Sequence, residues 1–507
     1  MPATVSQSAL RPGTRRTGVT SPAASFWCVT SILHADRFFD PEPGTRLIAR
    51  EIYESVGDLP LICPHGHVDA SIFASDEPFP DPASLIVSSD HYILRMLYSQ
   101  GIPMETLGLS PRDGTPVQAD PRDAWRRFAS NYFLFRGTPS KAWVDHVLHE
   151  VFELARPLSA DTADVAYDEI AEKLASREFR PRALFDRFRI EVLATTDGAT
   201  DPLASHAAVR ASGWQGRVIP TFRPDALFSI ASSAWRSDIE SLARVAGTDI
   251  RGFDAFLDAV RERRRFFISR GATATDHGVE SPLTRRLPPP TVHDLFRKAL
   301  GGTATAHDQA SFGAHMLLEM AQMSTEDGLV MQLHAGSARN HNRYVHDRFG
   351  PDKGADIPLQ TEFTRNLSEL LNEFGNDPRF SLIVFTLDES AYSRELAPLA
   401  GHYPALRLGP AWWFHDSIEG MTRYREQTTE TAGIYNTAGF NDDTRAFCSI
   451  PARHDMSRRV DANFLARLTA RHRITKGEAI EMARALAYDL PKRSYRLDAI
   501  DAAGQKS

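Results

Sequence analysis

The feature of this sequence that most constrains the fold is a repeated alternation between short apolar runs and helix-like segments. Each run ends in polar or aromatic residues, and a stretch with helical spacing of apolar residues comes after it. This alternation is typical of βα units with parallel strands. Eight such runs, with reactive side chains at their carboxyl ends, predict an α/β fold of the (β/α)8 TIM-barrel type. The runs cover residues 61–69, 191–197, 217–223, 272–277, 329–334, 381–388, 405–413 and 435–443.

The stretches around these runs set the expected domain organisation. Apolar residues at helical spacing predict a helix over Pro43–Val56, directly before the first run. Residues 70–188 read as mostly helical, so we expect a helical insertion after the first barrel strand. Residues 1–30 are rich in Ser, Thr, Pro and Arg, which predicts a disordered N-terminal tail. We expect the barrel with its insertion over residues 31–492 and a polar C-terminal tail over 493–507.

Composition excludes several classes of partner. The 58 basic and 65 acidic residues give a net charge of -7, which offers no general attraction to nucleic acid or to an anionic membrane surface. No run approaches the roughly 18 apolar residues of a membrane span. The three cysteines, Cys28, Cys63 and Cys448, are odd in number and far apart. They argue against a disulfide framework and favour a reducing, cytoplasmic location. The sequence leaves open whether the chain forms a homo-oligomer.

Two histidines at the end of the first run indicate a metal site. Side chains at i and i+2 of a strand point to the same face, so His65 and His67 direct both imidazoles into one space. Two imidazoles in one space suit a single divalent metal ion. The alternative interpretation is that both histidines are polar residues of a turn, and the dipeptide spacing alone favours that alternative.

The expected barrel adds further ligands to the same place. The carboxyl ends of all barrel strands meet at one face, so residues far apart in the sequence converge there. His334 ends the fifth run and Asp443 ends the eighth. Together with His65 and His67 they predict a site for one divalent ion, zinc or another first-row metal such as manganese.

Seven sequence blocks in a fixed order resemble one known family. On the basis of these blocks, the chain from about residue 38 to about residue 491 resembles the uronate isomerase (glucuronate isomerase) family of the amidohydrolase superfamily. The resemblance implies that D-glucuronate is interconverted with D-fructuronate, and D-galacturonate with D-tagaturonate. The blocks are His65-Gly66-His67, Asp90-His91-Tyr92 with Arg95-Met96, Thr195-Thr196-Asp197, Arg223-Pro224-Asp225, Gln332-Leu333-His334 leading to Ala338-Arg339-Asn340, Trp412-Trp413-Phe414, and Asp443-Thr444-Arg445 with Arg453-His454.

An isomerase of this kind moves a proton between C2 and C1 of the sugar through a cis-enediol. A metal held by His65, His67 and Asp443 would polarise the oxygens at C1 and C2. His334 is either a fourth ligand or a hydrogen-bond donor to a metal-side oxygen, and a buried core histidine is the structural alternative. The proton shuttle is either Asp443 or Tyr92, and the sequence does not choose between them. Tyr92 would need a lowered pKa for this role.

Further residues are assigned to the substrate. Arg223 is the expected clamp for the sugar carboxylate, because a guanidinium presents a bidentate fork to a carboxylate. Arg445 is expected to stabilise charge on the enediolate, and Arg339 is a further candidate for binding the substrate. His91 is expected to bind a sugar hydroxyl, and Trp413 to stack on the apolar face of the sugar. Structural ion pairs for the arginines and a core position for Trp413 are the alternatives.

Two rival functions stay open at this stage. The first is a mononuclear metal-dependent hydrolase on the same barrel. A binuclear hydrolase bridged by a modified lysine is disfavoured, because none of the seven lysines lies at an expected strand end. The second rival is a sugar-acid sensor or a catalytically inactive relative. All the expected catalytic groups occur together, which favours an enzyme acting on a small hexuronate.

Overall fold

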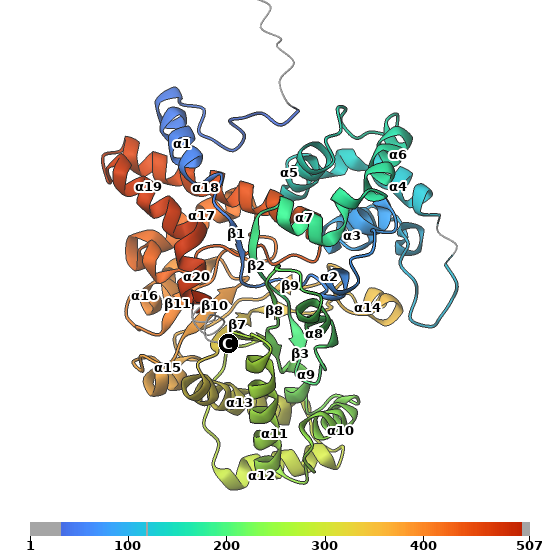
Figure 1. Cartoon of the computed structure of the whole chain (residues 1–507). Helices are drawn as coiled ribbons and strands as arrows, with labels where there is room; N and C mark the ends of the chain where they lie inside the picture. The colour runs from blue at the N-terminus through green and yellow to red at the C-terminus, as the bar shows by residue number, and fades with distance from the viewer. Residues whose placement is uncertain (1–31, 118–119, 499–507) are drawn as a thin grey trace, which may run out of the picture.

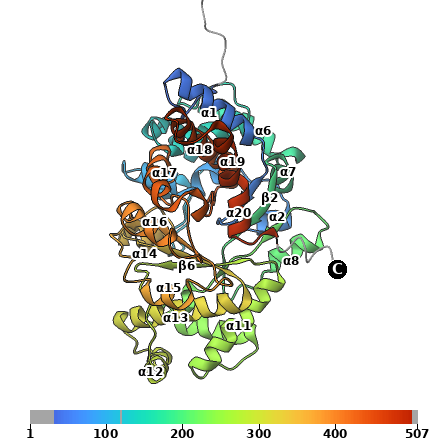
Figure 2. The same cartoon turned by 90° about the vertical axis from the view of Figure 1, so that its left-hand side faces the viewer.

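The computed structural model describes residues 32–117 and 120–498, with parallel strands at the centre and helices around them (Figures 1 and 2). The expected tail over residues 1–30 therefore lies outside the described residues. The fold is α/β. The parallel strands are β1 Leu61–Cys63, β2 Ile190–Ala194, β3 Asp197–Gly198, β4 Val218–Ile219, β5 Phe222–Arg223, β6 Ala274–Val279, β7 Val330–Ala335, β10 Leu382–Thr386 and β11 Leu406–Leu408. A separate antiparallel pair consists of β8 Ser337–Ala338 and β9 Ile357–Pro358.

Within each sheet, neighbouring strands lie side by side in the same order as along the chain. One sheet has the order β1-β2-β4 and the other β11-β10-β7-β6-β5-β3. Only residues 195–196 separate β2 from β3, and only residues 220–221 separate β4 from β5, so these two chain segments join the sheets. Beyond β11, Leu408 forms a bridge with Thr437, and the backbone N–H of His67 donates to the carbonyl of Thr444 at 3.0 Å. This order of neighbours, which returns to the segment after β1, is consistent with a (β/α)8 barrel.

Apolar side chains from the strands meet in one interior cluster. It draws residues from β1, β2, β4, β6, β7 and β10 and from Ala438. The end of the described chain completes it, because Tyr495 and Leu497 are buried there, and the Tyr495 hydroxyl donates to Gln332 Oε1 at 3.0 Å. The core therefore extends into the range expected to be a polar tail, whose residues 499–507 lie outside the described part of the chain.

Seven of the eight predicted runs contain strand residues. The first run and the eighth differ from the prediction. The first strand ends at Cys63, before His65 and His67, because Pro64 has no N–H to continue the ladder. The prediction of a strand over 435–443 is wrong. Its start is a 3₁₀ turn, Ile434–Asn436, and Thr437 forms a single bridge. Gly433 and Gly439 both have positive φ, 67° and 79°, which turns the backbone out of the extended conformation on either side.

The predicted helix over Pro43–Val56 is confirmed as α1. The Glu42 side chain accepts from the N–H groups of Gly44 and Thr45, and Pro43 fits the first turn, where no N–H is needed. The buried face of α1 packs on α18 and α19. Between β1 and β2 lie the helices α2 Ser71–Ser75, α3 His91–Tyr98, α4 Pro121–Ser130, α5 Pro139–His146, α6 Ala163–Leu174 and α7 Pro181–Arg187.

The remaining helices follow the strands and cover their outer side (Figure 1). They are α8 Ala204–Ala211, α9 Asp225–Phe228, α10 Trp235–Ala246, α11 Phe253–Ser269, α12 Pro289–Leu300, α13 Ala306–Asp327, α14 Arg343–Phe349, α15 Ser368–Phe374, α16 Ala397–Ala400, α17 Ile418–Ala432, α18 Ile450–Ala470, α19 Lys476–Arg484 and α20 Leu490–Ser494. None of the described helices combines the length and the apolar character that crossing a membrane would need.

Candidate active site

One pocket collects the side chains that the sequence nominates. Its volume is about 1050 Å³, counted to the open mouth, and it lies where the segments beyond the strand ends come together. Because several strands deliver residues to the same end, positions separated by hundreds of residues meet here. The sequence-predicted residues that line it are His65, His67, His91, Tyr92, Arg223, His334, Arg339, Trp413, Asp443 and Arg445.

His65, His67 and Asp443 form a compact group of metal-type donors. Asp443 Oδ1 lies 3.4 Å from His65 Nε2 and 3.1 Å from His67 Nε2. Burial alone would raise the pKa of Asp443, but the two histidines hold it well below its usual range. A carboxylate and two imidazoles at these separations fit a divalent first-row ion, because all three donor atoms face one point. The residues present therefore fit the metal that the sequence predicts.

His334 stands beside this group and belongs to a second one with His65 and Asp276. Its ring stacks on His65, with centroids 4.7 Å apart, and its Nδ1 lies 2.7 Å from Asp276 Oδ1. Burial would raise the pKa of Asp276, but Arg223 and His334 lower it well below its usual value. The ionised Asp276 therefore accepts from Nδ1–H of His334. In neutral His334, the buried Nε2 then carries a lone pair, which suits a ligand or an acceptor and not the expected donor.

Two guanidinium groups converge over Gly278, at the end of β6. Arg223 bonds to Asp225 at 2.8 Å and to Asp276 at 3.2 Å, which fixes its position. A Cβ added at Gly278 would lie 2.9 Å from Arg223 Nη2 and 3.0 Å from Arg339 Nη2. The missing side chain of Gly278 therefore leaves room for two cations side by side. Such a pair suits the binding of a carboxylate.

The hydroxyl of Tyr92 is held by an acid that the sequence did not nominate. It donates to Asp416 at 2.6 Å, and Arg453 Nη1 contacts the same carboxylate at 2.9 Å. Burial and Asp416 raise the pKa of Tyr92 well above its ordinary value, although Arg453 opposes this. The surroundings therefore do not provide the lowered pKa that Tyr92 would need as a base. Tyr92 can accept a proton only as it passes its own to Asp416.

The remaining nominated residues form one wall of the pocket. The Trp413 ring lies 4.4 Å from His91 and 4.2 Å from Tyr92 between centroids, so it is both buried and part of the site. Burial, followed by Arg445 and Arg453, lowers the pKa of His91 to about 3, which keeps this imidazole neutral. A neutral imidazole can donate to or accept from a sugar hydroxyl.

Sequence reasoning missed several acids of this pocket. Arg445 pairs with Asp352 at 2.9 Å, and Arg339 pairs with Asp356 at 3.2 Å. Both acids lie in the segment after α14, far from any expected strand end, so no pattern pointed to them. Asp416 follows the Trp412-Trp413-Phe414 block closely, and that position was the available signal. Other pocket residues that the sequence did not assign to the site include Trp143, Gly354, Ala411, Met421, Phe440, Asn441, Asp442 and Met456.

The described residues that line the pocket include no lysine. Residues 44–495 match the family model for glucuronate isomerase. The chain is 56% identical over 466 residues to the uronate isomerase of Phenylobacterium zucineum, covering 92% of this chain and 97% of that protein.

Solved structures agree with the sequence comparisons. The glucuronate isomerase of Caulobacter crescentus superposes with a TM-score of 0.90 at 53% identity, covering 92% of this chain and 97% of that one. The uronate isomerase of Thermotoga maritima gives a TM-score of 0.85 at 26% identity, covering 91% of this chain and 99% of that one. The family match, the high identity over nearly the whole of both chains and the shared fold lead to one conclusion. This chain belongs to the glucuronate isomerase family of enzymes, the uronate isomerases.

Proposed function

We propose that this enzyme interconverts D-glucuronate with D-fructuronate, and D-galacturonate with D-tagaturonate. One observation carries the proposal: the pocket holds a group of metal-type donors and, within the same cavity, a pair of arginines over Gly278. A hexuronate has the matching pair of features, a carbonyl with neighbouring hydroxyls at one end and a carboxylate at the other. The family of the chain supports the same reaction.

The ion that fits the donor group best is zinc. His65, His67 and Asp443 would hold it, and His334 Nε2 is the candidate for a further ligand because Asp276 occupies its other ring nitrogen. Manganese is the alternative that the same donors accept. When bound, such an ion supplies a positive charge and Lewis acidity beside the oxygens at C1 and C2.

Arg223 and Arg339 are the proposed clamp for the sugar carboxylate. Arg223 is held by Asp225 and Asp276, so its guanidinium is oriented before the substrate arrives. A fixed guanidinium binds a carboxylate at a smaller cost in side-chain entropy than a mobile one. Binding the carboxylate here would hold C2 of the sugar at a fixed distance from Asp443, which is what proton transfer requires.

Asp443 is the proposed proton shuttle between C2 and C1. It is ionised, and it lies among the donors that would face the reacting oxygens. Tyr92 with Asp416 is the second route, because the hydroxyl can take up a proton while Asp416 accepts one. Arg445 would stabilise negative charge on the enediolate, His91 would bind a hydroxyl, and Trp413 would cover the apolar face of the sugar.

The experiment that tests this function is a ketose-forming assay on D-glucuronate and on D-galacturonate, before and after metal removal by a chelator. We expect turnover of both uronates, loss of turnover after chelation, and recovery with Zn²⁺ or Mn²⁺. In D₂O, ketose formation should place deuterium at C1. Hydrolysis of lactones or amides without ketose formation would overturn the proposal in favour of a hydrolase, and binding of uronates without turnover would indicate a sensor.

We place the enzyme in the cytoplasm. Cys63 and Cys448 are both buried free thiols, and a reducing compartment keeps thiols in this state. Detection of the protein by antibody in the cytosolic fraction of its source cells would agree with this location, and its recovery from the periplasm would contradict it.

A further inference from the structure

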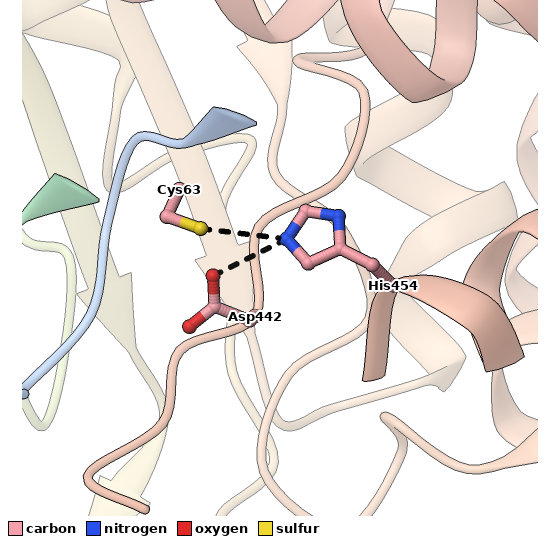
Figure 3. A group of neighbouring side chains, drawn as sticks. All are labelled: Cys63, Asp442 and His454. Carbon is pink, nitrogen blue, oxygen red and sulfur yellow. Dashed lines mark hydrogen bonds and ion pairs between the residues drawn. The ribbon is translucent and has the colours of Figure 1, made fainter. Parts of the chain in front are cut away.

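A second group of metal-type side chains lies beside the candidate active site. Cys63 is the last residue of β1, Asp442 lies in the segment before α18, and His454 lies on α18 (Figure 3). Their donor atoms all lie within 4.8 Å of one another. The side chains of Asp442 and His454 are 1% and 3% exposed, and Cys63 is buried to the same degree. The end of β1 and a stretch nearly 400 positions further along the chain therefore place a thiol, a carboxylate and an imidazole in one buried space.

The distances within this group match those between the ligands of a metal ion. His454 Nε2 lies 3.4 Å from Asp442 Oδ2 and 3.6 Å from Cys63 Sγ. An N–H···O hydrogen bond is usually about 2.7–3.2 Å long, so the first distance is too long for a strong one. In a tetrahedral zinc site with bonds of about 2.3 Å to sulfur and about 2.0–2.2 Å to nitrogen and oxygen, neighbouring ligands are about 3.6 Å apart for S···N and about 3.4 Å apart for N···O. The observed separations have these values.

The direction of the donors agrees with the distances. Figure 3 shows Cys63 Sγ and an oxygen of Asp442 both facing the same nitrogen of His454. One ring nitrogen has either one proton to donate or one lone pair to offer, so it cannot satisfy both neighbours with two full hydrogen bonds. A cation between the three atoms satisfies all of them at once.

We propose that Cys63, Asp442 and His454 form a second metal site that takes Zn²⁺ or another thiolate-binding first-row divalent ion. Binding uses one lone pair each from Sγ, Oδ2 and Nε2, and the thiol proton leaves to solvent. The charge of the group therefore changes from -1 to zero, because the ion brings two positive charges and one proton departs. Three protein ligands leave a fourth position, which water fills at zinc sites of this kind. The proposal does not depend on the substrate of the enzyme.

Two pockets border the proposed site. Asp442 lines the active-site pocket, whereas His454 lines a separate surface pocket together with Leu61 and Arg458. The proposed site therefore lies between two pockets, each lined by one of its residues. An entry path is one of the features that a metal site must offer.

The site also has a consequence for the adjacent acid. Asp443 has a φ of 41°, in the left-handed region that non-glycine residues adopt at a cost. An ion on Asp442 would fix the residue immediately before this turn to β1 and to α18. It would thereby hold the Asp443 carboxylate against His65 and His67.

Cobalt spectroscopy tests the proposal without reference to activity. The full-length protein is freed of metal by a chelator and titrated with Co²⁺ alone, because a thiolate ligand adds a near-ultraviolet charge-transfer band that nitrogen and oxygen ligands do not produce. We expect two Co²⁺ per chain, one of which produces this band. Cys63→Ser should bind one Co²⁺ and lose the band. His67→Asn, which weakens the other site, should retain it.

Cys448→Ser and Cys28→Ser are the matched controls, and both should retain the band and both ions. The proposal is overturned if the wild-type protein binds Co²⁺ without a thiolate band, or if the band survives in Cys63→Ser. Circular dichroism identifies any variant that fails to fold. Should Cys63→Ser be that variant, the wild-type spectrum shows whether a thiolate binds, and loss of the band in either control would assign it to another cysteine.

Discussion

Asp442 and Asp443 are neighbours in the chain, yet each carboxylate lies in a different group of side chains. Asp443 contacts two histidines in an open pocket, and its side chain and that of His67 are 15% and 21% exposed. Asp442 lines the same pocket but contacts His454 behind its wall, where both side chains are almost fully buried. Two adjacent aspartates thus have different surroundings. Asp443 lies where ligands can enter and leave, and Asp442 contacts side chains that stay buried. The backbone at Asp443 is left-handed, with a φ of 41°.

This difference indicates a division of tasks. A group that must admit a substrate needs an opening and room for a ligand of several atoms. A group that only ties three segments together works better when it is sealed, because water is excluded from its contacts. We therefore expect changes around Asp443 to reduce turnover, and changes around Asp442 to reduce stability first.

Asp443→Asn should produce the largest effect. The amide keeps the volume of the side chain but removes the charge that faces His65 and His67. We expect kcat/KM for D-glucuronate to fall by about a thousandfold or more, with little change in the unfolding temperature. A steady-state assay with a melting curve on the same sample measures both. Activity within tenfold of wild type would remove Asp443 from the reaction and end the contrast with Asp442.

Arg223→Lys should have the next largest effect. Lysine keeps the charge but loses the planar fork that contacts Asp225, Asp276 and the proposed substrate carboxylate. We expect kcat/KM to fall by about a hundredfold, mainly through a higher KM. Gly278→Ala should act in the same direction, because its new Cβ would crowd the Nη2 atoms of both arginines. Arg265→Lys, at an exposed helix position, is the matched control. An unchanged KM in both test variants would place the carboxylate elsewhere.

His454→Gln tests the sealed side of the comparison. The variant removes the imidazole that contacts buried Asp442, which costs about 1–3 kcal/mol in free energy of unfolding. We expect kcat/KM per folded molecule to fall by less than about tenfold, so stability falls more clearly than catalysis. Urea unfolding followed by fluorescence gives the first quantity, and the uronate assay gives the second. A variant as stable as wild type but inactive would mean that both groups serve the reaction directly.

Asp197, at the start of β3, is a third acid to compare with Asp442 and Asp443. Its side chain accepts a hydrogen bond from a neutral hydroxyl. It accepts from Thr195 at 2.6 Å, and burial raises its pKa to about 7, a shift that the Thr195 hydrogen bond reduces and Asp201 increases. Between its unfolded pKa near 3.8 and about 7, the folded protein keeps a proton that the unfolded chain has released. Stability is therefore lost as the pH rises through this window and levels off above it.

Asp197→Asn should remove this dependence. Relative to wild type, we expect the variant to gain on the order of 1–2 kcal/mol of unfolding free energy between pH 4.5 and pH 8, after allowance for the partial exposure of the group. Urea titrations of both proteins at the two pH values measure the difference. A difference that does not vary with pH would show that Asp197 is ionised throughout.

Much of the fold could be predicted because its signals are local. The βα alternation and helix α1 follow from apolar spacing and end signals that a few residues carry. The missing strand over 435–443 could not be predicted, because the left-handed turns at Gly433 and Gly439 depend on how that segment packs, with Gly439 close against Pro491. Periodicity describes one segment at a time and does not contain such contacts.

The candidate site was predictable to a similar degree. The expectation that strand ends gather distant residues led to His65, His67 and Asp443, which the structure places together. The environment of Tyr92 was not predictable, because the acid that binds its hydroxyl lies 324 positions further along the chain. The group around Cys63 and His454 was missed for a similar reason, since one member lies on a helix and no sequence pattern joins it to the others.

The placement of Tyr495 and Leu497 in the interior cluster bears on how the enzyme is made. The first strand leaves the ribosome early, but the side chains that complete the interior around it come from the last residues of the described chain. Until those residues have emerged, the nascent protein exposes part of its apolar interior. A premature stop codon a few positions before Tyr495 would therefore affect the whole molecule.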